Sequence, residues 1–144
     1  MSVGQSIEAL DPATSQDLAA KREWVTGHYD AQSLDKYQTL TGKLDLLATI
    51  LAEGWVKRAD QLKLQSLGVG FGDAIAQDTL MEWVVVDDEY GRSAALNWPG
   101  TTLLCFPLTM ISKRIENGEA VDVYDLFEGV CERLKELAFS GDYV

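Results

Sequence analysis

"LQSLGVGFGDAIAQD", residues 64–78, has a glycine at every second position, at Gly68, Gly70 and Gly72. A dinucleotide-binding fingerprint reads G-x-G-x-x-G after a strand, and a P-loop follows its last glycine with lysine and then serine or threonine. Here the spacing is G-x-G-x-G, the preceding residues read as helix, and Asp73 and Ala74 follow. Asp73 would also repel a phosphate, so the stretch does not favour a nucleotide site.

Helical geometry accounts better for these glycines. Gly68, Gly72 and Ala76 lie four residues apart and share one face of a helix, where small residues allow another backbone to approach closely. Each glycine inside a helix costs about 0.5–1 kcal/mol relative to alanine, which close packing must offset. An adjoining apolar stripe is formed by Leu64, Leu67, Phe71 and Ile75. The sequence therefore predicts a tightly packed helix over roughly 60–77, capped by Asp60.

Helices are also expected before this stretch. Residues 1–13 read as loosely ordered, and residues 14–58 as N-terminal helices. The first helix is expected to begin with Thr14 or Ser15 as its cap, and a second covers roughly 33–53, with Gly54 as its stop signal.

Three strands are predicted after the glycine helix, near 81–88, in "RSAALNW" and in "TTLLCF". Turn signals at "DDEYG" and at Pro99–Gly100 join them by short connections, which favour an antiparallel meander. Apolar residues occupy both faces of the strands, so we expect helices or another subunit to cover the sheet on both sides. Two helices should follow, one opened by Pro107 and one capped by Asp122.

The predicted fold is therefore one α+β domain over residues 1–144, with N-terminal helices, a three-stranded antiparallel meander and two C-terminal helices. The chain has 23 acidic and 12 basic residues and a net charge of −11. Such a charge disfavours nucleic acid and anionic membrane surfaces as partners and favours a basic protein. Cys105 and Cys131 are most simply free thiols, with a disulfide left open. No signal-peptide pattern is visible, and we expect a cytoplasmic location.

Two long stretches resemble a family. "LGVGFGDAI" and "EWVVVDDEYGRSAALNWPGTTLLCFPLTMISKRIENGEAVDVYDLF" look like the mostly bacterial family of domain of unknown function 3806. The resemblance runs from the glycine helix through Phe127 and implies a family-like core over residues 60–140. It implies no activity.

The first hairpin carries the candidate binding residues. Asp87, Asp88 and Glu89 form a carboxylate cluster, and Tyr90 and Arg92 flank Gly91. Lys113 and Arg114, on the short helix after Pro107, could complete a recognition patch if the two elements lie close together. The alternative is a solvated turn, with Arg92 or Arg114 pairing internally with the acids.

No catalytic constellation or metal site is expected, and no cofactor. His28 is the single histidine, and no serine lies in a nucleophile motif. The hairpin acids do not fit the sequence pattern of a calcium-binding loop. The soft ligands for zinc, His28, Cys105 and Cys131, lack the paired spacing of a zinc site.

The function expected from these observations is that of a cytosolic bacterial accessory or protein-interaction domain that binds a protein partner. The last helix carries Asp125, Glu128, Glu132 and Glu136 on its outer side, which indicates either a solvated face or an acidic docking surface. A homodimer is a further expectation. The alternative function is a small-molecule-binding protein or enzyme that uses the polar groups of the hairpin and short helix.

Overall fold

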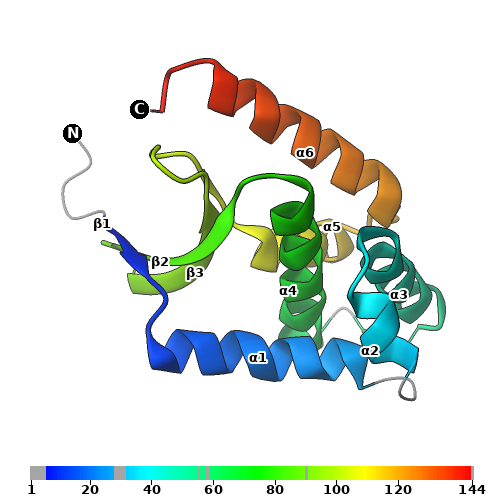
Figure 1. Cartoon of the computed structure of the whole chain (residues 1–144). Coiled ribbons are helices and arrows are strands. Elements are labelled where there is room, and N and C mark those ends of the chain that lie inside the picture. The colour runs from blue at the N-terminus through cyan, green and yellow to red at the C-terminus, as the bar shows by residue number, and fades with distance from the viewer. Residues whose placement is uncertain (1–5, 28–31, 55, 58, 90, 144) are drawn as a thin grey trace.

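The computed structural model describes residues 6–27, 32–54, 56–57, 59–89 and 91–143, which contain both helices and strands (Figure 1). In chain order the elements are β1 (Ser6–Ala9), α1 (Pro12–Thr26), α2 (Gln32–Tyr37), α3 (Leu40–Ala52), α4 (Gln61–Asp78), β2 (Glu82–Asp88), β3 (Gly91–Asn97), β4 (Leu104–Cys105), the short 3-10 helix η1 (Pro107–Thr109), α5 (Met110–Glu116) and α6 (Val123–Phe139). The predicted α+β class is confirmed.

α4 occupies the centre of the molecule (Figure 1). The sheet lies on one side of it and α2 and α3 on the other, while α1 and α6 cross below and above it in this view. Among the described helices, none is long and apolar enough to cross a membrane.

The sheet has four antiparallel strands in the order β1-β2-β3-β4, one more than the predicted meander. The additional strand pairs Ser6 with Asp87 and Ala9 with Val84, so the prediction that residues 1–13 are loosely ordered is wrong for 6–9. All four side chains of β1 are exposed. β1 is held by main-chain hydrogen bonds to β2, and its four residues, Ser-Ile-Glu-Ala, alternate over too short a run to predict a strand.

Helix boundaries in the N-terminal half also differ from the prediction. α1 begins at Pro12, not after Thr14 or Ser15, because Asp11 Oδ1 accepts a hydrogen bond of 2.7 Å from the Thr14 N–H. The predicted helix over 33–53 is two helices, since Thr39 caps α3 by accepting from the Gly42 N–H at 2.9 Å. A cap inside an apolar periodic run is easily read as part of one continuous helix.

The later elements follow the predicted order. Gly91 and Gly100 take positive φ angles of 112° and 80° in the two turns. The third strand is shorter than "TTLLCF" and comprises only Leu104–Cys105, and Pro107 opens η1 before α5 begins. Asp122 caps α6 by accepting from the N–H groups of Tyr124 and Asp125.

The glycine face of α4 packs closely against its neighbours, as predicted. A Cβ at Gly68 would lie 2.5 Å from Leu108 Cα, and one at Gly72 would lie 2.5 Å from Trp83 Cζ2 and 2.7 Å from Pro107 Cγ. Such distances leave no room for a methyl group. The two glycines therefore let η1 and Trp83 of β2 lie directly on α4.

Both faces of the central strands β2 and β3 carry apolar side chains that are buried within the chain. The predicted stripe of α4, Leu64, Leu67, Phe71 and Ile75, is fully buried in the main core. On the other face of the sheet, Val84, Val86 and Ala95 form a smaller buried cluster with Leu104 packed against it. The strands themselves therefore give no reason to invoke a second subunit.

The two cysteines are free and buried. Burial raises the pKa of each thiol to about 12, so both remain protonated at neutral pH.

We expect Gly68→Ala to lower the free energy of unfolding by about 1–3 kcal/mol, because the methyl group meets the Leu108 backbone, which cannot move aside as a side chain can. Chemical denaturation measures the change. Gly129→Ala in α6 is the matched control: a Cβ there meets nothing within 4 Å. It should instead stabilise by about 0.5–1 kcal/mol. Equal effects of the two substitutions would contradict the close-packing account.

Candidate functional site

Arg92 holds one of the predicted hairpin acids, Asp87, together with two acids from the N-terminal segment. It faces Asp87 across the β2–β3 pair, and its Nη1 donates to Asp87 Oδ2 at 3.2 Å and to Glu8 Oε2 at 3.2 Å. Its Nη2 donates to Asp11 Oδ2 at 2.7 Å. The guanidinium is thus shared by three carboxylates in an exposed cluster, which is the internal pairing left open for Arg92.

The remaining predicted site residues belong to the hairpin turn and to α5. Asp88 is half-buried and Glu89 exposed at the hairpin turn, while Tyr90 and the single histidine, His28, lie outside the described residues. Lys113 and Arg114 are exposed on α5, where Arg114 Nη1 lies 4.0 Å from Glu119 Oε1.

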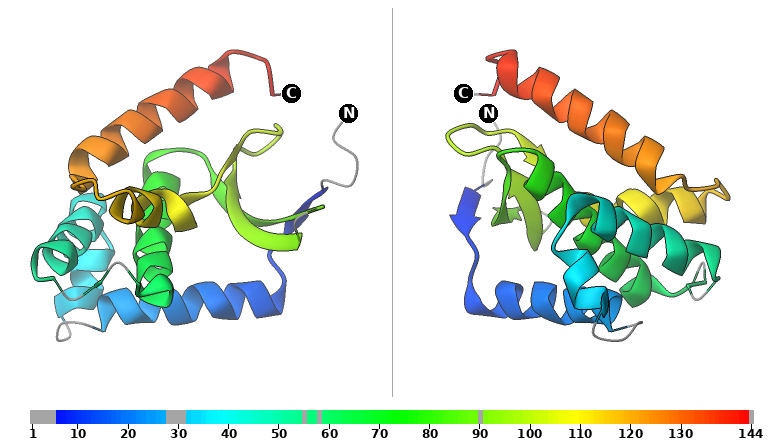
Figure 2. Two further views of the ribbon diagram at one scale, coloured as in Figure 1. Left: turned by 180° about the vertical axis from the view of Figure 1, so that it is seen from behind. Right: turned by 45° about the vertical axis from the view of Figure 1, so that its right-hand side comes forward.

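Figures 1 and 2 place α5 beside α4 and below α6, whereas the turn end of the β2–β3 hairpin lies beside β1 on the opposite side of the molecule. The predicted recognition patch required the hairpin and the short helix to lie close together, and they do not. After the hairpin, the chain passes through β4 and η1 before it reaches α5 beside α4.

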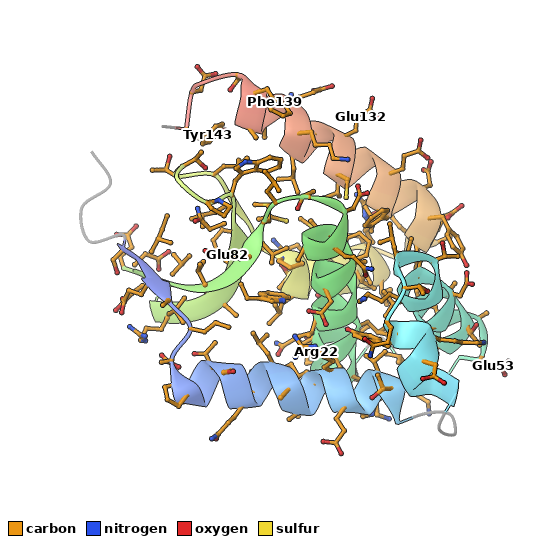
Figure 3. The ribbon with its side chains drawn as sticks, viewed as in Figure 1. Arg22, Glu53, Glu82, Glu132, Phe139 and Tyr143 are labelled. Atoms are coloured by element: carbon orange, nitrogen blue, oxygen red, sulfur yellow. The ribbon has the colours of Figure 1, made fainter. Side chains whose placement is uncertain are left out.

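A second polar cluster surrounds Asp73, in the middle of α4. Arg22 Nε donates to Asp73 Oδ2 at 2.5 Å and Arg22 Nη2 to Oδ1 at 2.9 Å (Figure 3). Trp83 Nε1 donates to Oδ1 at 2.8 Å, and the Tyr37 hydroxyl donates to Oδ2. Four hydrogen bonds from α1, α2 and β2 therefore satisfy one carboxylate whose side chain is only 11% exposed.

The groups around Asp73 show the electrostatic effects of this arrangement. Burial, reinforced by the Asp73 carboxylate, raises the pKa of Tyr37, and hydrogen bonding to Asp73 raises the pKa of Arg22. Nearby, Lys43 Nζ donates to Gln77 Oε1 at 2.5 Å and lies 5.0 Å from the centre of the Tyr37 ring. Burial lowers the pKa of Lys43.

The Asp73 cluster is structural in character, because each carboxylate oxygen already accepts two hydrogen bonds. Sequence reasoning treated Asp73 only as an argument against phosphate. A signal was present, since Asp73 is the one charged residue between positions 64 and 77. A charge inside a helix that is buried along most of its length requires partners.

A groove between α5 and α6 has the character of a binding surface. It has a volume of about 540 Å³, and Met110, Val121, Leu126 and Val130 contribute its apolar lining. Gly129 also lines it, together with Arg114, Arg133, Asp122 and Asp125.

The outer side of α6 carries Asp125, Glu128 and Glu132, which we call the α6 carboxylates. Asp125 lines this groove, whereas Glu128 and Glu132 line a second groove together with Asp78 and Lys135. All three are exposed. Within the described residues, none of the three forms an ion pair, whereas Arg133 pairs with Glu136 at 3.3 Å and Lys135 with Asp78 at 3.0 Å. Figure 3 shows Glu132 pointing outward from α6, away from the body of the protein. Sequence reasoning identified these acids but had no means of finding the groove beside them.

We expect Asp73→Ala to lower the free energy of unfolding by about 2–4 kcal/mol, because it leaves a partly buried guanidinium, a hydroxyl and an indole N–H without their acceptor. Urea unfolding monitored by tryptophan fluorescence measures the loss. Glu136→Ala removes a carboxylate paired with Arg133 on α6, where the two side chains are 61% and 67% exposed, and should change stability by no more than about 0.5 kcal/mol. A loss of similar size in both variants would argue against a structural role for the Asp73 cluster.

A second expectation concerns pH. The hydrogen bond from the Thr14 backbone, with a further contribution from Arg92, lowers the pKa of Asp11 from 3.8 to about 2. Its contribution to stability is therefore complete above pH 3.8 and is lost as the pH falls through about 2.

Arg92→Ala should raise the Asp11 pKa while leaving it below 3.8, because the Thr14 N–H remains. Carboxyl-carbon NMR titration gives the midpoint, with Arg133→Ala as the control exposed arginine. An Asp11 midpoint that does not move in Arg92→Ala would show that the arginine does not act on it.

Comparisons with known proteins bear on family and fold. A family model described as Domain of unknown function (DUF3806) matches residues 43–127, which extends the resemblance to include most of α3. A solved structure from Bacteroides thetaiotaomicron VPI-5482, at 1.50 Å resolution, is similar with a TM-score of 0.73 and 11% identity over 92% of this chain. At that identity the likeness concerns the fold alone.

This chain spans only 49% of that solved chain. The search of curated proteins gave no significant match. The family model covers more than half of the sequence. The protein therefore belongs to the family described as Domain of unknown function (DUF3806).

Proposed function

We propose that this chain is a cytoplasmic bacterial accessory domain that binds a basic protein partner on the outer face of α6. The observation that carries the proposal is the set of α6 carboxylates, which form no ion pair within the described residues. Neighbouring cations are already engaged, Arg133 by Glu136 and Lys135 by Asp78.

The α6 carboxylates are unfavourable for the free protein. Glu128 and Glu132 are four residues apart on one helix, where like charges destabilise by a few tenths of a kcal/mol. The net charge of −11 adds a long-range repulsion among acids. A basic partner would relieve both effects and would be steered toward α6 by the same field.

The hairpin offers a weaker case for recognition. Arg92, its main cation, is already surrounded by Glu8, Asp11 and Asp87. Lys113 and Arg114 belong to α5, which lies beside α4 and away from the turn end of the hairpin (Figure 2). We therefore favour partner binding at α6 over a small-molecule site built from hairpin and short-helix groups.

A double substitution, Glu128→Gln with Glu132→Gln, tests the proposal. The fold should persist with an equal or slightly higher melting temperature, because a repulsion is removed. Affinity capture from a lysate of the source organism at low salt should lose the proteins that bind the wild-type chain, and added salt should release them from the wild type.

The matched control is Glu53→Gln with Glu82→Gln, which changes the net charge equally at exposed positions away from α6 (Figure 3). It should retain capture. Equal loss in both double variants would mean that only the overall charge matters, and unchanged capture in both would remove α6 as the binding face.

A further inference from the structure

We propose that the groove between α5 and α6 binds the apolar side of an amphipathic helix of the basic partner, and that Gly129 is where this helix comes closest to α6. The inference rests on the proposed function and specifies the partner. The groove has an apolar floor from Met110, Val121, Leu126 and Val130 and an open side along α6.

Gly129 lies inside a helix, and packing within the chain does not explain why this position is a glycine. At Gly68 and Gly72 an added Cβ would meet Leu108 or Trp83 at 2.5 Å, whereas at Gly129 nothing lies within 4 Å. Glycine in the middle of the 17-residue α6 destabilises the helix relative to alanine without any gain within the chain. A missing side chain at the edge of an apolar groove allows a second backbone to approach α6.

The charges around Gly129 indicate the flanks of the guest helix. Asp125 lies four residues before it and also lines the groove. Glu132 lies three residues after it on the helix surface and lines the second groove. Two arginines also line the groove, but Arg114 lies 4.0 Å from Glu119 and Arg133 3.3 Å from Glu136. The unpaired charge at the rim is therefore negative, which suits lysine or arginine beside the apolar side of the guest.

The secondary structure of the guest follows from the apolar lining. A helix satisfies its own backbone hydrogen bonds, whereas an extended segment in this groove would need main-chain partners that helices α5 and α6 do not offer. A second copy of this chain is a poor occupant, because pairing two α6 helices would bring their carboxylates together. A basic amphipathic helix from another protein satisfies its own backbone hydrogen bonds and carries a charge opposite to that of the α6 carboxylates.

A synthetic peptide provides the probe. We suggest a fluorescein-labelled Leu/Lys peptide of about 18 residues with leucines at helical spacing, and a scrambled peptide of the same composition. Fluorescence anisotropy should give a Kd about tenfold lower for the ordered peptide than for the scrambled one, because only the ordered sequence presents a continuous apolar face.

Gly129→Met is the decisive variant, since a Cβ at this position meets nothing within 4 Å and the longer side chain would occupy the groove. We expect it to weaken binding of the ordered peptide about tenfold while the melting temperature is unchanged or higher. Gly129→Ala, which changes the helix backbone in the same way but fills little space, should keep the Kd within about twofold of wild type.

The remaining outcomes separate the groove from the acidic face. Equal binding of both peptides, lost in Glu128→Gln with Glu132→Gln, would overturn the groove proposal and leave the acidic face of α6 as the site. Binding that survives both Gly129→Met and the double glutamine variant would overturn both. A dimer in sedimentation that Gly129→Met dissociates would assign the groove to a second copy and overturn the proposed occupant.

Discussion

One side chain, Trp83, ties together the two features of α4 on which the fold depends. Its ring lies where a Cβ of Gly72 would stand, and its Nε1 donates to the carboxylate of the next residue, Asp73. Asp73 also accepts from Arg22 of α1 and Tyr37 of α2. A methyl group at position 72 would displace the ring and remove a donor from a carboxylate that is largely shielded from water. The close packing at Gly72 and the hydrogen bonding of Asp73 therefore depend on the same side chain, Trp83.

The sequence predicts the parts of this arrangement that are local. The helix over 60–77, its small-residue face and the β2–β3 hairpin follow from spacing and turn residues that lie within a few positions of one another. The Asp73 cluster does not, because its donors come from positions 22, 37 and 83 and meet only after folding. β1 was missed for the same reason: a short exposed edge strand depends on the neighbour it pairs with more than on its own residues.

The candidate site also has features that local sequence patterns predict and features that depend on the fold. The charge pattern of α6 can be read directly from the sequence, because residues three and four apart share a face. The separation of the hairpin turn from α5 depends on the path of β4 and η1 past α4, which no local pattern encodes. Pairing of Arg92 with Asp87 was foreseeable from the hairpin register, but Glu8 and Asp11 enter only through β1 and the start of α1.

The groove beside α6 arises from a difference in helix length. α5 has 7 residues and α6 has 17, so α5 can cover only part of the flank that α6 presents to it. α6 is anchored by Val123, Phe127, Cys131 and Leu134, which are buried, while Leu126 and Val130 on the adjacent flank remain only partly buried. Stability is thus concentrated around α4, where neighbouring elements pack against Gly68 and Gly72 and donate four hydrogen bonds to the Asp73 carboxylate. α6 instead carries a glycine without a packing partner and repelling acids. Those features lower the stability of the free chain. A bound basic helix would pack against the glycine and pair with the acids.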